Sequence, residues 1–227
     1  MPRKDTLPIR LLMIIGSLIA IIVISMILST YPTAITFMAE NKKAITLIHV
    51  ISMALGLGGA TFSDYFFFKF LKDFKISKFE KDVLDALSNI IWVMLFVAII
   101  SGVGLFLPEA GRFMASTKFL LKLIVVSVIT LNGIALNILI APSLMKFSFR
   151  KDSHPTHKTV HFTRRLGFAL GSVSILSWYS AFFLGSFRSL PWSFETLLIG
   201  YIVLLACGIV GSQLLDAWFC HKGKGCK

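Results

Sequence analysis

A single histidine stands inside an apolar run near the start of the chain. The stretch IHVISMALGLGG covers residues 48–59 and places His49 near its beginning, followed by Ser52 and Met53. An imidazole nitrogen and a thioether sulfur suit soft copper better than magnesium or calcium. Residues four apart in a helix share a face, so His49 and Met53 are the candidate metal ligands and Ser52 is a candidate supporting residue.

Other uses of this histidine stay open. Its ring can be hydrogen-bonded to a neighbouring serine or backbone carbonyl, can ligate haem iron, or can transfer a proton. Haem b is therefore the alternative cofactor. The other four histidines fall in segments assigned below to the opposite side of the membrane, so a haem at His49 needs a Met, a Lys or a partner chain as its second ligand. A scaffold or assembly protein without a ligand is the third possibility.

The composition around these residues is that of a membrane protein. Of 227 residues, 56% are hydrophobic and 15% charged, and the mean hydropathy is +0.82; soluble domains carry about 25% charged residues. Runs of about 20 apolar residues can cross a bilayer, and in lipid they must be helical. We therefore predict an all-α polytopic bundle of six transmembrane helices in a single domain, residues 1–227. The predicted spans are residues 9–28, 44–71, 87–107, 118–141, 166–186 and 195–218.

Basic residues predict the orientation of this bundle. With the N-terminus inside, 17 of the 23 Lys and Arg residues fall in cytoplasmic segments and six on the other side. Both termini are then cytoplasmic, and the first span is a retained signal anchor in the cell's inner (cytoplasmic) membrane. The net charge of +12 is explained by this topology and by anionic lipid heads. We expect the lipid bilayer as a partner, together with a homo-oligomer or a membrane partner subunit, and no nucleic acid.

Several further polar residues lie inside predicted spans, and three of them lie on the second and fourth spans near the candidate site or the basic residues. Asp64 is near the inner end of the second span, within about one turn of Lys69, so we expect an interfacial carboxylate rather than a proton site. Lys122 enters the fourth span about as deep as His49 and either snorkels to the surface or contributes to the site. Asn132 follows on the same span, where such residues hydrogen-bond across helices. Lys122 and Asn132 are therefore candidates for residues that support the metal ligands or line the path of an ion.

The order of short motifs in the chain is similar to that of a known family. His49 precedes the pair Gly58-Gly59, the next span ends in SGVGL at residues 101–105, and the following one begins STKFLLKL at residues 116–123. Over about residues 45–142 this order resembles the CopD-like copper-resistance membrane domain. The resemblance implies movement of copper across the inner membrane. The residues that carry over are His49, Gly58, Gly59, Ser101, Gly102 and Lys122; where the family usually has a tryptophan, this chain has Gly56.

A second set of soft ligands occurs on the predicted cytoplasmic side. The loop between the fourth and fifth spans has H-x2-H-x3-H spacing, and the C-terminal tail adds cysteines and another histidine. Together these residues could accept zinc or a soft ion leaving the membrane, although a solvated basic loop is the simpler interpretation. The residues of this candidate cluster are His154, His157, His161, Cys220, His221 and Cys226. With no P-loop, no GxSxG and no paired carboxylates in a span, the sequence gives little support for an enzyme.

Overall fold

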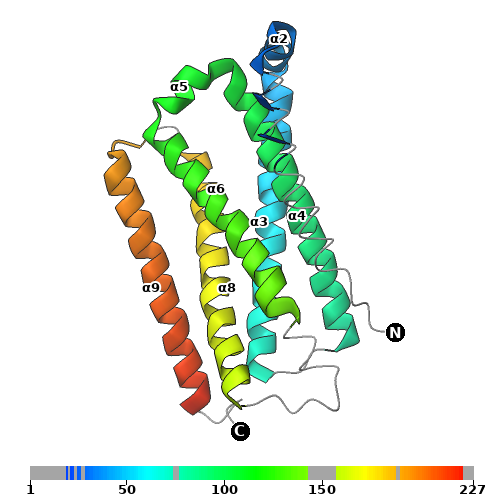
Figure 1. The fold of residues 1–227 in the computed structure, drawn as a ribbon, viewed down its shortest axis with the longest axis vertical. Coiled ribbons are helices and arrows are strands. Elements are labelled where there is room, and N and C mark those ends of the chain that lie inside the picture. The colour runs from blue at the N-terminus through cyan, green and yellow to red at the C-terminus, as the bar shows by residue number, and fades with distance from the viewer. Residues whose placement is uncertain are drawn as a thin grey trace. The chain divides into compact units, whose positions relative to one another are not determined.

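The computed structural model describes residues 29–73, 77–142, 157–187 and 190–221, together with Ile19, Ile21, Ile22, Ser25 and Met26. For residues 68, 70–73, 157–161 and 219–221 it describes the backbone alone. Within these residues all regular structure is helical (Figure 1). The prediction of an all-α protein is therefore confirmed.

Five helices in the described part of the chain are long and apolar enough to cross a membrane. They correspond to the second to sixth predicted spans, whereas the first predicted span, residues 9–28, lies almost entirely outside the described residues. Short helices occupy two of the connections between the predicted spans. The five long helices are α3 (Lys42–Asp73), α4 (Lys78–Phe106), α6 (Thr117–Ala135), α8 (His157–Ser186) and α9 (Phe194–His221). The short ones are α2 (Pro32–Glu40), η1 (Leu107–Glu109) and α5 (Ala110–Met114).

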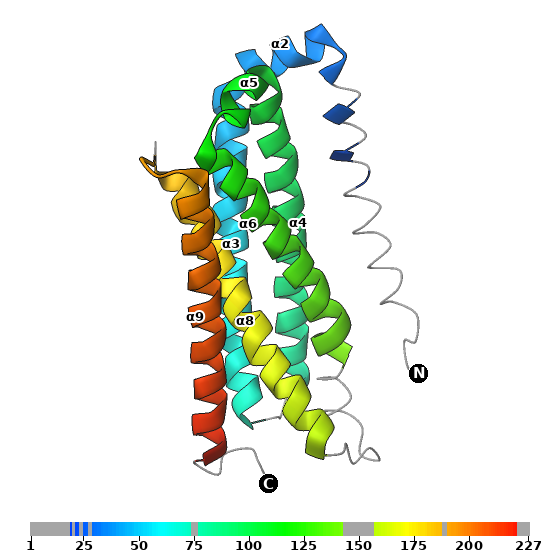
Figure 2. The ribbon, with the colours of Figure 1, turned by 60° about the vertical axis from the view of Figure 1, so that its left-hand side comes forward.

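The chain divides into two compact units. The first contains Met1–Gly56 and Trp92–Ser116, and the second contains Leu57–Ile91 and Thr117–Lys227. Helices α3 and α4 thus contribute residues to both units. Within the second unit, α8 lies side by side with α6 and with α9 in both ribbon views (Figure 2).

Helix α4 begins ahead of its predicted start at residue 87 because a capping box fixes an additional polar turn. The Ser77 hydroxyl accepts a hydrogen bond from the Glu80 amide at 3.2 Å, and the Glu80 carboxylate accepts one from the Ser77 amide at 3.0 Å. This reciprocal pair satisfies two amide donors that a helix start otherwise leaves open. The Glu80 carboxylate also forms an ion pair with Lys69 of α3 at 3.3 Å. This ion pair links the end of α3 to the start of α4.

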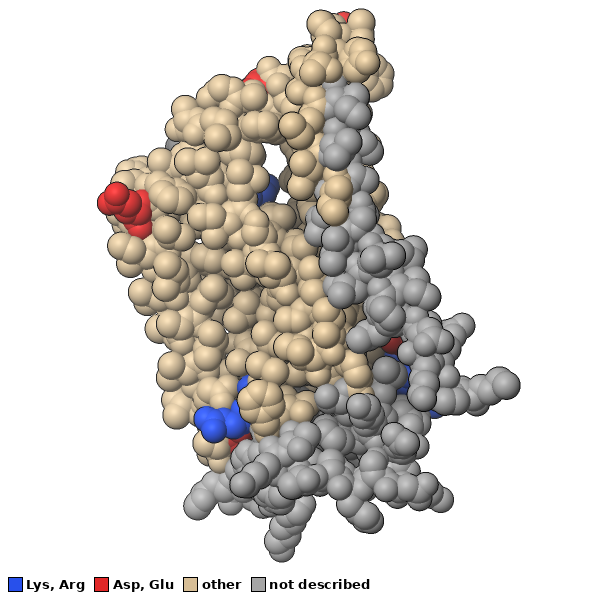
Figure 3. Space-filling view, in the orientation of Figure 1, with Lys and Arg blue, Asp and Glu red and all other residues tan. Residues whose placement is uncertain are grey.

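Helix α9 has the reverse of the pattern expected of a helix in water. Large apolar side chains are exposed along its length, while several polar side chains in its interior are buried. Its exposed carboxylate, Glu195, lies in the first turn of the helix, and the surface over the apolar middle of α9 is free of charged atoms in the view of Figure 3. Because soluble helices turn their apolar side chains inward, this pattern supports a lipid environment. The exposed side chains include Ile199, Ile202, Val203, Val210, Leu214 and Trp218; the buried polar ones are Tyr201, Ser212 and Asp216.

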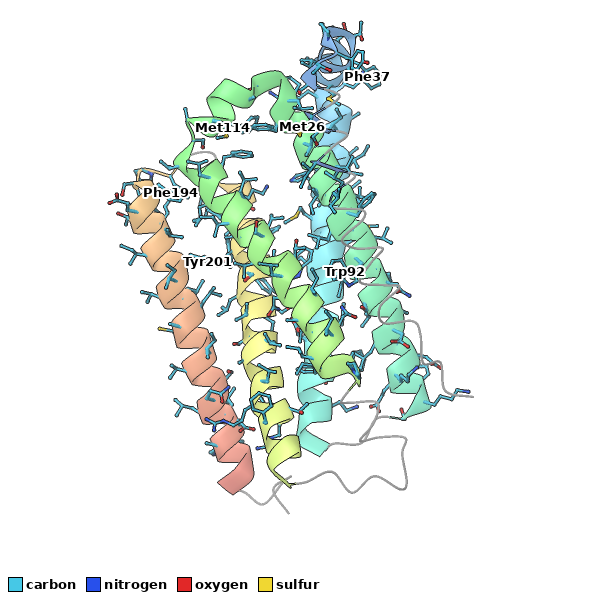
Figure 4. The ribbon with its side chains drawn as sticks, in the orientation of Figure 1. Met26, Phe37, Trp92, Met114, Phe194 and Tyr201 are labelled. Carbon is cyan, nitrogen blue, oxygen red and sulfur yellow. The ribbon has the colours of Figure 1, made fainter. Side chains whose placement is uncertain are left out.

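A buried ion pair joins α8 to α9. Arg164 and Asp216 are only 2% and 3% exposed; the Arg164 Nε donates to the Asp216 carboxylate, and its Nη2 donates to the Asp216 carbonyl oxygen at 3.0 Å. The charge pattern places Arg164 in a cytoplasmic loop, but the structure buries it inside α8, because a carboxylate of α9 neutralises it. Further along the same interface, Tyr201 extends from α9 toward α8 and shares a 2.8 Å hydrogen bond with Ser177 (Figure 4).

Close backbone approach accompanies these polar contacts. A Cβ added at Gly208 of α9 would lie only 2.2 Å from the Leu176 Cδ1 of α8. In α3, a Cβ at Gly59 would lie 3.1 Å from the Ile91 Cγ1 of α4, whereas one at Gly58 would meet nothing within 4 Å. Only the second glycine of the GG pair therefore faces α4. Small residues serve here as they do in other lipid-embedded interfaces, by letting helices pack tightly.

Helix α6 continues past Ala135 as a π-helical turn, η2, over Leu136–Ile140. Ile140 is 1% exposed and forms a buried apolar cluster with Phe67 of α3 and Phe168 of α8. The three large side chains stabilise this end of the second unit by close van der Waals packing between helices. The π-helical turn thus lies where α6 meets both neighbouring helices.

Breaking the α8–α9 ion pair should destabilise the protein strongly. Removal of one partner leaves the other charge buried and unpaired, at a cost of about 3–5 kcal/mol. We expect Asp216→Leu to lower the midpoint of thermal unfolding in detergent markedly. The double replacement Arg164→Met/Asp216→Leu should recover most of that loss, since no buried charge remains. A double variant as unstable as the single one would contradict this account.

Candidate metal centre

His49 is held by α4 through one of its ring nitrogens. Its Nδ1 lies 2.9 Å from the Ala98 carbonyl oxygen and 3.0 Å from the Ser101 hydroxyl oxygen. The Ser101 hydroxyl lies 2.6 Å from the Val97 carbonyl oxygen, to which it donates. All of these residues belong to the first unit. The sequence-level alternative of an imidazole bonded to a serine or a backbone carbonyl is therefore confirmed, with both partners supplied by the neighbouring helix.

These contacts decide which nitrogen of the ring carries hydrogen. A carbonyl oxygen only accepts, so the Ala98 contact requires a hydrogen on the His49 Nδ1. In the neutral ring, Nε2 then carries the lone pair. Histidines that bind metals are commonly oriented by the same kind of bond, in which the other ring nitrogen donates to a carbonyl or carboxylate. The arrangement therefore gives His49 the tautomer that a metal ligand at Nε2 requires.

Two glycines of α4 allow this close approach. A Cβ at Gly102 would lie 3.4 Å from the His49 Cε1, and one at Gly104 would lie 3.5 Å from the Ile45 Cγ2. A single Cβ at either position would make an ordinary van der Waals contact, whereas a larger side chain would push α4 away from the α3 segment that carries the histidine. The motif SGVG thus contributes one polar partner, Ser101, and two small surfaces that fit against the ring and its neighbour.

Ser52 and Met53 lie within about one turn of His49 on α3. Ser52 is 2% exposed and donates its hydroxyl hydrogen to the His49 carbonyl oxygen at 2.9 Å, so it contacts the backbone of the histidine and not its ring. Met53 is 9% exposed. Because residues four apart on a helix are neighbours, the Met53 thioether is within reach of the same face as the imidazole. His49, Ser52 and Met53 thus occupy neighbouring positions on α3, and their role as a metal site stays a prediction.

Lys122 and Asn132 belong to the second unit, where both contact α8. The Lys122 Nζ lies 3.7 Å from the position that a Cβ at Gly185 would take. The Asn132 Nδ2 donates to the Leu170 carbonyl oxygen at 3.1 Å. Thr130 and Asn137, by contrast, donate to carbonyl oxygens four residues earlier in the same helical segment. Of these polar residues of α6, Asn132 makes the cross-helix bond that the sequence predicts.

The described residues contain no group of three or more His, Cys, Asp and Glu side chains that could hold a metal ion. The predicted cytoplasmic cluster is not part of this comparison, because its side chains lie outside the described residues. Helix α8 begins at His157, and α9 ends at His221, so part of the cluster's backbone is helical. The cluster outside the described side chains comprises His154, His157, His161, Cys220, His221 and Cys226.

Asp64 is buried rather than interfacial. It is 5% exposed and accepts a hydrogen bond from the Ser174 hydroxyl of α8, whereas Lys69, expected beside it, pairs with Glu80. The sequence signal for this burial is the position of Asp64 on a helix face that also carries Ser52, Gly56 and Ala60, since small and polar residues in a membrane span face other helices.

No family model, curated protein or solved structure matches the chain. The CopD-like resemblance accordingly stays a prediction based on short motifs over about residues 45–142. The function is therefore argued from the geometry of the described residues.

The packing of His49 against Gly102 gives a test of the ring's position. Gly102→Ala should leave the ring in place, because the added Cβ meets Cε1 at ordinary contact distance. Gly102→Val adds two methyl groups and should displace the ring from Ala98. In 15N-histidine NMR spectra of the protein in micelles, we expect the neutral His49 to carry its hydrogen on Nδ1 in the wild type and in Gly102→Ala. Gly102→Val should lose this signature; an unchanged spectrum would show that Gly102 does not position the ring.

Proposed function

We propose that the protein handles a soft metal ion, Cu(I), in the outer half of the membrane, and that the ion is its cargo. The His49 Nε2 and the Met53 sulfur are the ligands. Ser52 supports the helix at this point, and Ser101 orients the ring. The observation that carries the proposal is the bond from the His49 Nδ1 to the Ala98 carbonyl oxygen, because it leaves the lone pair on Nε2.

The chemistry of the two ligands favours copper over other ions. Imidazole and thioether are soft or borderline donors, while magnesium and calcium take oxygen ligands. Structural zinc sites use four ligands, mostly cysteine and histidine, and no such group occurs among the described side chains. A site of one His and one Met suits an ion that is bound and released. The CopD-like order of motifs supports the same cargo.

A b-type haem is the second candidate, because the orientation of His49 also suits an axial ligand of haem iron. The second axial ligand would then come from a partner chain. A visible absorption spectrum of the purified protein separates the two, since bound haem gives a Soret band and Cu(I) gives none. A protein that binds neither would be a scaffold or assembly partner.

We also propose the topology that the basic residues predict, with six spans, both termini cytoplasmic and the protein in the inner membrane. The ion pair between Lys69 and Glu80 supports this orientation, because it lies near the ends of α3 and α4 that the proposal assigns to the cytoplasm. The opposite ends carry the short helices α2 and α5 and the contact between Lys42 and Glu109.

Copper binding is tested directly by titration. We expect the protein in detergent, under anaerobic conditions, to take one Cu(I) per chain from a chromophoric competing chelator. His49→Ala should weaken binding by roughly 100-fold or more, because loss of a ligand exceeds the 10–100-fold effect of losing a supporting bond. Met53→Ile should weaken it by about tenfold.

The matched control for Met53 is Met26→Ile, since Met26 is 67% exposed and its loss should not alter the affinity. A wild-type protein without measurable Cu(I) affinity, or a His49→Ala variant with unchanged affinity, would refute the copper proposal.

The topology is tested by cysteine labelling in intact cells. In a background lacking the three native cysteines, Ala39→Cys on α2 should react with a membrane-impermeant maleimide added outside. Phe79→Cys, at a position 76% exposed near the start of α4, should react only after lysis. Equal labelling of both positions in intact cells would rule out the proposed orientation.

A further inference from the structure

The second unit contains a buried set of oxygen-bearing side chains that the copper proposal does not use. Asp64 on α3, Asn132 on α6 and Ser174 on α8 are 5%, 7% and 8% exposed. All three belong to helices long and apolar enough to cross a membrane. Ionisable and polar groups in such positions are costly and commonly functional.

The three side chains converge on one turn of α8. The Ser174 hydroxyl donates to the Asp64 carboxylate, and the Asn132 Nδ2 donates to the Leu170 carbonyl oxygen at 3.1 Å. In a helix, the carbonyl of residue 170 faces residue 174, and the side chain of residue 174 leans back toward it. Asp64 and Asn132 therefore reach the same place on α8 from two different helices.

Two oxygen atoms of this cluster have no hydrogen-bond partner among the described protein groups. They are the Asp64 Oδ2 and the Asn132 Oδ1, and both are buried. An unpaired buried polar atom is rare in folded proteins, and one on a carboxylate is especially unfavourable. Both atoms are acceptors, so what suits them is a positive charge or a donor.

Basic side chains of the second unit form ion pairs at other positions. Arg164 pairs with Asp216, and Lys69 pairs with Glu80. A carboxylate at Asp64 is thus not neutralised by either of these cations. One monovalent cation would balance its single charge and would be ligated by oxygen alone.

We propose that Asp64, Asn132 and Ser174 form a buried binding site for Na⁺. The Asp64 carboxylate supplies the charge, and the Asn132 amide oxygen and the Ser174 hydroxyl supply neutral oxygen ligands. Hard cations select oxygen donors of this kind, and a single carboxylate matches a monovalent ion better than a divalent one. Intramembrane carboxylates that pair with ions occur on transport paths. The Na⁺ site does not depend on copper binding at His49.

The test compares thermal unfolding of the purified full-length protein in NaCl and in choline chloride at equal ionic strength. An ion that binds only the folded state raises the unfolding temperature with saturation. At about tenfold excess over the dissociation constant, the wild type should gain roughly 3–5 °C. KCl and LiCl titrations report the selectivity of the site.

The variants assign the effect to the cluster. Asp64→Asn keeps the size of the side chain and removes its charge, and should abolish the Na⁺ response. Asp82→Asn is the matched control, since Asp82 is an exposed acid on α4 of the same unit, and should respond as the wild type does. Ser174→Ala should lower the apparent Na⁺ affinity by about tenfold, in line with the loss of one neutral ligand.

Three results would overturn the Na⁺ site: equal unfolding temperatures of the wild type in the two salts, a full Na⁺ response in Asp64→Asn, or unchanged affinity in Ser174→Ala. The first of these would mean that water or a proton satisfies the two oxygens. If Asp64→Asn does not fold, the Ser174→Ala titration decides, because that variant retains the carboxylate. None of these outcomes depends on Cu(I), so the copper and Na⁺ proposals fail separately.

Discussion

A polar group in an apolar membrane helix must find its partner within the protein, and the packing of α8 follows from this constraint. Hydrocarbon offers no hydrogen bonds, so an unpaired group there costs several kcal/mol by order of magnitude. Arg164 meets Asp216, Ser177 meets Tyr201, and the Leu170 carbonyl receives Asn132. These contacts lie at successive levels of α8 and fix its rotation against α6 and α9. Apolar packing alone, which is as favourable with lipid as with another helix, would not select one rotation.

The long helices were predictable from the sequence, whereas their polar ends were not. Apolar runs of sufficient length predict spans in any membrane protein, and α9 agrees with the predicted residues 195–218 to within a few positions. Helix α8, in contrast, begins at His157, well ahead of the predicted residue 166. The first turns of α8 are basic, so the sequence predicts a loop there. The residue that stabilises them, Asp216, lies far away in the chain. An acid inside the last predicted span was the available signal.

Residue types identified the candidate site, but the partners of its residues required coordinates. His49 is conspicuous as an imidazole in an apolar run, and the sequence allows a ligand, a proton carrier or a bonded ring. The choice of nitrogen depends on the Ala98 carbonyl, a backbone atom that no residue type reveals. For Asp64 the prediction from residue types was wrong, because nearby lysines in the sequence suggested an interfacial group. In the structure Lys69 pairs with Glu80, and Asp64 is hydrogen-bonded to Ser174 instead. A short separation between an acid and a lysine in one helix therefore does not predict an ion pair when a carboxylate of the next helix binds the same lysine.

The π-helical turn at Leu136–Ile140 has a mechanical consequence for α6. A regular helix advances about 100° per residue, so between Leu121 and Ile140 its inward stripe would drift by about 100°. A π-helical turn holds more residues than an α-helical one and therefore offsets much of this rotation about the helix axis. As a result, Leu121 and Ile140, which are both buried, lie on the same side of α6. The wide turn therefore corrects the phase of α6, so that one helix can present buried residues to the same neighbours at both of its ends.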